Sequence, residues 1–92
     1  MNEVKLAVGS LALDLKRTGL YLHQNALSTA SGFEEEAHKR IKEISLENVD
    51  PYLVQLVKGA ESVLQMPVTE DRKAEDAIMY ARLLQNYTQK YL

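Results

Sequence analysis

Residues 3–28 read EVKLAVGSLALDLKRTGLYLHQNALS, and apolar side chains recur on two sides of the helix that they predict. One stripe has the 4-3-4-7 spacing of a helix face. It consists of Val4, Val8, Leu11, Leu15 and Leu22. A second stripe recurs every seven residues on nearly the opposite side, and consists of Leu6, Leu13, Leu20 and Leu27. A helix that packs on a single layer does not need the second stripe, so we expect something to cover it.

The rest of the chain predicts three more helices. The expected bounds of the four segments are 3–28, 32–44, 51–66 and 70–91, in the order long, short, short, long. Small polar residues at 28–32 indicate a turn, and Ser31 and Glu34 have the spacing of a capping box for the second helix. Asp50 followed by Pro51 predicts the start of the third helix, because aspartate caps well and proline is tolerated in the first turn. The predicted fold is therefore an all-α bundle in a single domain spanning residues 1–92.

Composition and charge restrict the function classes. The chain has 92 residues, of which 46% are hydrophobic and 26% charged, which argues against intrinsic disorder. Its net charge of −2 comes from interspersed charges of both signs, so no overall field attracts nucleic acid or an anionic membrane. Cysteine is absent, which excludes disulfides and thiolate metal sites. We expect a cytoplasmic protein that binds neither nucleic acid nor a membrane.

The second leucine stripe predicts assembly. Two short helices can shield only part of both sides of the long first helix. We therefore expect a homodimer, or a higher oligomer, with Leu6, Leu13, Leu20 and Leu27 at the interface. Two alternatives remain at this stage: a monomer whose own helices cover the first helix, and a complex in which a helix of another protein covers it.

Three tyrosines near the C-terminal end are a second candidate binding surface. Tyr80, Tyr87 and Tyr91 share one flank of the last predicted helix. Tyrosine is enriched at protein interfaces because it combines apolar area with a hydroxyl group. Packing at the edge of the core is the simpler interpretation of the same pattern.

Signals for chemistry are weak. Glu35 and His38 form one Glu-x-x-His motif, the spacing used in di-iron carboxylate bundles, which a dimer could duplicate. His38 lies away from the apolar side of its helix, however, which favours a solvated histidine. His23 lacks a nearby nucleophile or carboxylate partner, so we assign no catalytic residue, no cofactor and no metal ligand.

The sequence therefore predicts a non-enzymatic protein–protein interaction module, such as a small adaptor, regulator, inhibitor or chaperone-like protein. A metal-carboxylate protein that uses Glu35 and His38 across a dimer is one alternative. A nucleic-acid-binding regulator is another, but the third predicted helix carries a single basic residue, Lys58, where a recognition helix needs several.

Overall fold

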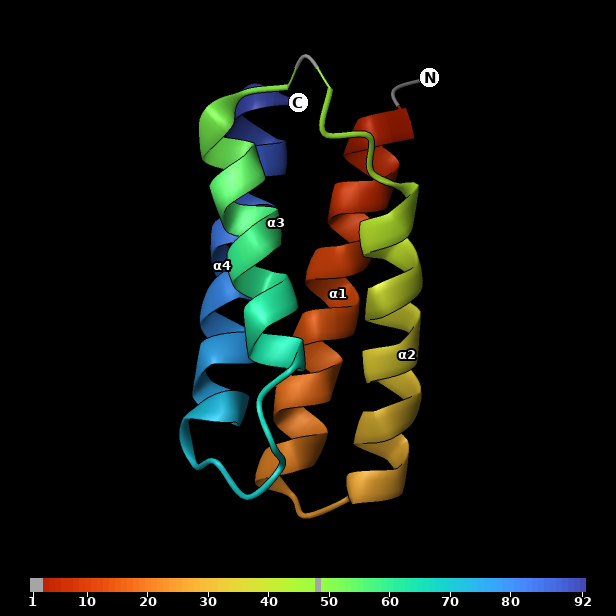
Figure 1. Cartoon of the computed structure of the whole chain (residues 1–92), viewed down its shortest axis with the longest axis vertical. Coiled ribbons are helices and arrows are strands. Elements are labelled where there is room, and N and C mark those ends of the chain that lie inside the picture. Colours follow the sequence, from red (N-terminus) through yellow and green to blue (C-terminus); the bar gives the residue numbers. More distant parts are fainter. Residues whose placement is uncertain (1–2, 48) are drawn as a thin grey trace.

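Four α-helices, each antiparallel to the one before it, make up the bundle (Figure 1). The computed structural model describes residues 3–47 and 49–92, and these residues contain no β-strand. The helices are α1 (Glu3–His23), α2 (Leu27–Glu43), α3 (Pro51–Leu64) and α4 (Arg72–Tyr91). The molecule measures 37 × 21 × 20 Å. The predicted all-α fold, with a long first and last helix and two shorter helices between them in the sequence, is confirmed.

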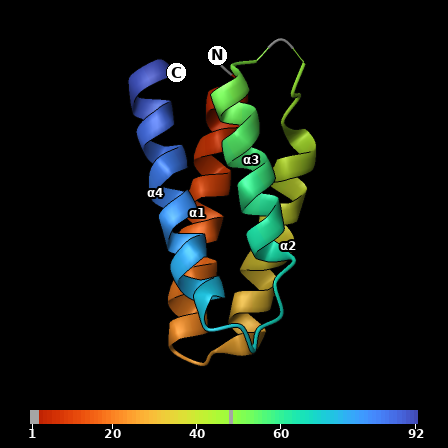
Figure 2. The same cartoon turned by 60° about the vertical axis from the view of Figure 1, so that its left-hand side comes forward.

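Helix α1 is the centre of the packing. It lies against both α2 and α4, whereas α3 packs on α4 and only lightly on α2 (Figures 1 and 2). Val8, Leu11 and Leu15 of the first predicted stripe are completely buried. They belong to the same core cluster as the buried residues of α3, which are Leu53, Leu56, Val57, Ala60 and Leu64. The inward position of these three residues is thereby confirmed, whereas Val4 and Leu22, at the ends of the stripe, are half-buried.

The boundary between the first two helices was predicted wrongly. Helix α1 ends at His23 rather than Ser28, and Asn25 adopts a left-handed conformation with φ of 58°. The Asn25 amide donates to the carbonyl of Leu22 (3.1 Å), and the Ala26 amide donates to that of Tyr21 (2.9 Å). These two bonds form a Schellman motif, which closes a helix after one left-handed residue, and asparagine tolerates that conformation better than most residues.

The stretch predicted to be a turn, residues 28–32, is instead the first part of α2, which begins at Leu27. Ser31 and Glu34 lie inside the helix, so they are not a capping box. Ala30 and Ala37 are the two buried residues of α2, seven positions apart. Their small side chains let α2 lie close along α1, and this tertiary packing outweighs the weak helix propensity of the serines and Gly32.

Two polar side chains fix the two ends of α3 in different ways. The Asp50 side chain accepts a hydrogen bond from the Tyr52 amide (3.0 Å), with Pro51 in the first turn, as the sequence predicted. At the other end of α3, buried Lys73 donates to the carbonyls of Leu64 (3.3 Å) and Met66 (2.8 Å). Its ammonium also pairs with Glu34 of α2, so one cation joins α2, α3 and α4.

Candidate interaction surface

Three leucines of α1 form a row on the side of the helix that faces away from the core. Leu6 is 55% exposed, Leu13 46% and Leu20 42%. We call this row, with Gly9 between its first two members, the leucine face. Residues seven apart on a helix are about 10.5 Å apart along its axis and nearly aligned around it, so the row is straight.

The chain's own helices leave the leucine face uncovered. Helix α1 itself lies between α2 and α4, as the alternative of a monomer with a central first helix expects. A row of half-exposed apolar side chains forgoes part of the stabilisation that full burial would give.

Leu27 was predicted to continue this row but does not. It is exposed, yet the Asn25 turn places it at the start of α2, on a different part of the surface. There it lines a small depression of about 80 Å³ together with Leu22, Val68 and Lys73. The seven-residue spacing would place Leu27 in the row only if α1 continued through residues 24–26, but α1 ends at His23.

Gly9 makes a gap in the leucine face. A Cβ atom built on Gly9 would meet no atom within 4 Å, so no contact within the chain requires glycine at this position. The next turns of the helix present two exposed cations, Lys16 and Arg17, between Leu13 and Leu20. The face thus combines three leucines, a gap near one end and a cationic turn beyond its middle.

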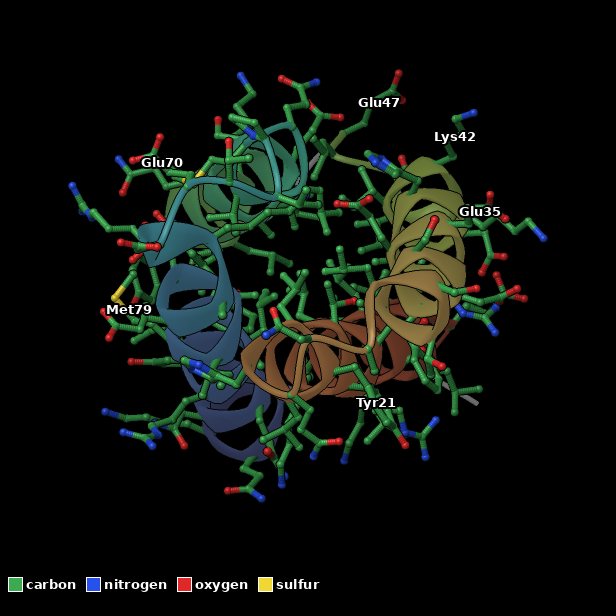
Figure 3. The ribbon with its side chains drawn as sticks, turned by 90° about the horizontal axis from the view of Figure 1, so that it is seen from below. Tyr21, Glu35, Lys42, Glu47, Glu70 and Met79 are labelled. Atoms are coloured by element: carbon green, nitrogen blue, oxygen red, sulfur yellow. The ribbon has the colours of Figure 1, made fainter. Side chains whose placement is uncertain are left out.

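Aromatic side chains fix the α2 flank of the leucine face. The rings of Tyr21 and Phe33 stack with their centroids 5.6 Å apart and their planes 8° from parallel. The Arg17 guanidinium lies 5.4 Å from the Phe33 ring centroid, within cation–π range. Viewed along the bundle, Tyr21 points outward from α1 (Figure 3). These contacts hold Arg17 at the border of the leucine face.

On the α4 flank, the surface carries a shallow depression of about 480 Å³. Ile78, Met79 and Leu83 supply its apolar lining, and His23 of α1 lies at its border. Met79 points outward from α4 (Figure 3). This places His23 at the edge between two helices, in a depression that Glu75 and Arg82 of α4 also line.

The three tyrosines do not form one exposed surface. Tyr87 is only 6% exposed, and its hydroxyl donates to Asp50 Oδ2 (3.2 Å), which links α4 to the start of α3. Burial, together with this hydrogen bond, raises the pKa of Tyr87 above its usual 10.0. Tyr80 is half-buried against Gly59, whereas Tyr91 is 57% exposed. The placement of Tyr87 matches the interpretation as core edge.

Asp14 is the buried acid of α1, on the side toward α2. Its carboxylate lies 3.9 Å from Arg40 Nε. Burial raises the pKa of Asp14, and the positive charge of Arg40 opposes that effect only in part. The carboxylate lies between two helices rather than in an open site, so it is not a candidate base. Because burial disfavours its ionised form, it destabilises the folded state at neutral pH.

Glu35 and His38 lie apart from the leucine face. Glu35 is exposed and points away from the bundle (Figure 3), and His38 is half-buried on the same helix. Across residues 3–47 and 49–92, no three acidic or histidine side chains gather closely enough to hold a metal ion. In the same part of the chain, no helix combines the length and apolar character needed to cross a bilayer.

Sequence reasoning found the leucine face but missed its surroundings. The roles of Gly9, Arg17 and Phe33 depend on which side of α1 each helix covers, and the residue pattern alone does not give that. The signal that could have corrected the position of Leu27 was Asn25, an asparagine able to end a helix. No family model, no curated protein and no solved structure matches the chain.

Proposed function

We propose that the protein is a non-enzymatic protein–protein interaction module that assembles through the leucine face, and that its first partner is a second copy of the chain. The observation that carries this proposal is the straight row of half-exposed leucines on α1. We place this assembly in the cytoplasm, as the absence of cysteine leads us to expect.

Apolar burial supplies the driving force for this assembly. Fully burying a leucine is worth about 1.5–3 kcal/mol, so a half-exposed one has about half of that left to gain. Three leucines from each of two copies therefore offer roughly 5–9 kcal/mol. Association itself costs about 4–15 kcal/mol in lost freedom of motion, so the predicted net affinity is modest.

The size of the leucine face leads to the same estimate. A helix the length of α1 presents a strip about 30 Å long and 10–12 Å wide, or roughly 300–350 Å². A stable interface of standard size buries about 800 Å² on each partner. At most about 5 kcal/mol remains after the cost of association, so we expect a concentration-dependent dimer whose dissociation constant is about 0.2 mM or above.

The proposal is tested by measuring the mass of the protein in solution by light scattering after size exclusion. The wild-type chain should approach twice the monomer mass at high concentration. Leu13→Glu should remain monomeric with unchanged helical content, because two carboxylates would meet in an apolar contact. Val68→Glu is the matched control, since Val68 is also about half exposed, at 55% against 46% for Leu13, but lies in the loop between α3 and α4.

Val68→Glu should dimerise like the wild type. A wild-type chain that stays monomeric at the highest concentration would show that the face does not pair with itself. Equal dimerisation of Leu13→Glu and the wild type would place the interface elsewhere.

A further inference from the structure

We propose that α2 opens as a unit: it detaches from the bundle and loses its helical hydrogen bonds, while α1, α3 and α4 stay packed together. Proteins open locally where an element buries few apolar side chains and where its ends are weakly fixed. Helix α2 has fewer buried residues than any other helix of the bundle. This inference does not depend on whether the leucine face pairs with a second copy.

Helix α2 contributes little apolar area to the core. Its buried residues are Ala30 and Ala37, and Ile44 is buried just beyond its end. Helix α3 has 14 residues against 17 in α2, yet it buries three leucines and two valines. Because an alanine side chain is a single methyl group, the buried residues of α2 give up little apolar burial when this helix detaches.

The contact between α1 and α2 contains buried polar groups that water would hydrate better. Arg40 Nε is buried, and no group in the described part of the chain accepts a hydrogen bond from it. The Asp14 carboxylate is 3.9 Å away, beyond hydrogen-bond distance, and Asp14 is itself only 8% exposed. Both groups gain hydration when the two helices separate, which offsets part of the cost of opening.

The first turns of α2 are weakly fixed. The left-handed Asn25 precedes the helix, and Ala26, at the cap position, has no side-chain oxygen that could accept a hydrogen bond from the first turn. Residues 28–32 include two serines, a threonine and a glycine, all of them weaker helix formers than alanine or leucine. Once the helix loses its contacts with α1, this segment has little tendency to stay helical.

The ion pair between Lys73 and Glu34 holds α2 closed. Lys73 is 3% exposed, and its ammonium pairs with Glu34 while it donates to the carbonyls of Leu64 and Met66. The pair thus connects α2 to α3 and α4, although α2 packs only lightly on α3. A depression of about 80 Å³ beside the pair leaves this end of α2 incompletely packed against the loop between α3 and α4. Loss of the ion pair should therefore promote the opening.

The other three helices keep contacts of their own when α2 detaches. In the view along the bundle, α2 and α4 lie on opposite sides of α1 (Figure 3). The close contact between α1 and α4 at Gly19 therefore does not involve α2. Helix α4 also holds α3, because Tyr80 lies against Gly59 and the Tyr87 hydroxyl donates to Asp50 Oδ2.

Opening changes the surface that the protein offers to other molecules. Ala37 and Ile44 belong to one core cluster with Leu11, Leu53 and Leu56. When α2 detaches, part of this cluster becomes accessible between α1 and α3. The closed bundle thus covers an apolar surface that a local opening exposes without unfolding of the whole domain.

The proposal is tested by hydrogen–deuterium exchange of the wild-type chain under native conditions, followed for each amide by NMR and corrected for intrinsic exchange rates. The slowest amides of each helix report its most protected state. Those of α2 should exchange at least about tenfold faster than those of α1, α3 and α4. If the slowest amides of all four helices share one opening free energy, α2 opens only with the whole protein and the proposal is wrong.

Low concentrations of urea give a second readout from the same experiment. Urea promotes an opening more strongly the more surface that opening exposes. The opening of α2 exposes less surface than global unfolding, so the exchange of α2 amides should rise less steeply with urea than that of the other helices. An equal urea dependence in all four helices would overturn the proposal.

Two matched variants test the role of the ion pair. Glu34→Gln removes the charge that pairs with Lys73, whereas Glu35→Gln removes the charge of an exposed neighbour that points away from the bundle (Figure 3). Glu34→Gln should speed the exchange of α2 amides by about tenfold or more, and Glu35→Gln should leave it unchanged. Equal exchange of α2 amides in the two variants would contradict the role of the ion pair in holding α2 closed.

Discussion

The close approach of α1 and α4 at Gly19 gives the sharpest prediction about the fold. A Cβ atom added at Gly19 would lie 2.6 Å from Ile78 Cγ1 and 2.8 Å from the carbonyl oxygen of Ala74. The Ile78 side chain can rotate away, but the Ala74 oxygen belongs to the backbone of α4. Gly19→Ala therefore forces the two helices that form the largest packing contact to separate.

The size of the effect follows from two opposing contributions. Overpacking costs typically about 1–3 kcal/mol, whereas replacing glycine by alanine in a helix returns about 0.5–1 kcal/mol. We expect the free energy of unfolding of Gly19→Ala to fall by about 1–2 kcal/mol. Gly32→Ala is the matched control, because a Cβ at this position in α2 meets nothing within 4 Å. It should gain about 0.5–1 kcal/mol.

The assay is urea unfolding followed by far-ultraviolet circular dichroism, with every variant at the same protein concentration because dimerisation makes apparent stability depend on it. Gly19→Ala should unfold at lower urea than the wild type, and Gly32→Ala at higher urea. If Gly19→Ala proved as stable as Gly32→Ala, the close contact between α1 and α4 would be refuted.

Three other substitutions test the remaining contacts, with stabilities measured in the same urea assay. Lys73→Ala should lose about 3 kcal/mol, because it leaves the Glu34 carboxylate and the carbonyls of Leu64 and Met66 without their cation; unchanged stability would contradict a structural role for this cation. Tyr87→Ala should lose about 3 kcal/mol and exposed Tyr91→Ala less than about 1 kcal/mol, and equal losses would contradict the different burial of the two rings. Asp14→Asn tests the pH dependence: because burial raises the folded-state pKa of Asp14, the wild type should gain stability relative to this variant as the pH falls from neutral toward 3.8, and a parallel pH dependence of the two proteins would contradict the raised pKa.

The sequence predicted those parts of the fold that local chemistry controls. Asp50 and Pro51 start α3 as expected. The Asp50 carboxylate accepts a hydrogen bond from a free amide of the first turn, and proline has no amide hydrogen that would be left unpaired there. The inward stripe of α1 was also predicted correctly, since helical period and burial are directly related. The end of α1 was missed because a left-handed Asn25 competes with an equally plausible turn at the serines.

The candidate site was predicted only in part, for a physical reason. Leu6, Leu13 and Leu20 share one unbroken helix, so their seven-residue spacing is enough to place them together. Leu27 lies beyond the turn, where that spacing no longer describes position in space. Tyr87 shares its helix flank with Tyr91, but α3 covers only the first of them. Which neighbour covers a flank depends on packing between distant segments, and that information is not present in the period of one helix.

Sedimentation equilibrium of the unmodified chain over a several-hundredfold range of concentration tests the central claim most directly. A leucine face that pairs with itself predicts an average mass that rises from one chain at the lowest concentration to two chains at the highest, along a single reversible curve. A mass equal to one chain at every concentration would contradict it.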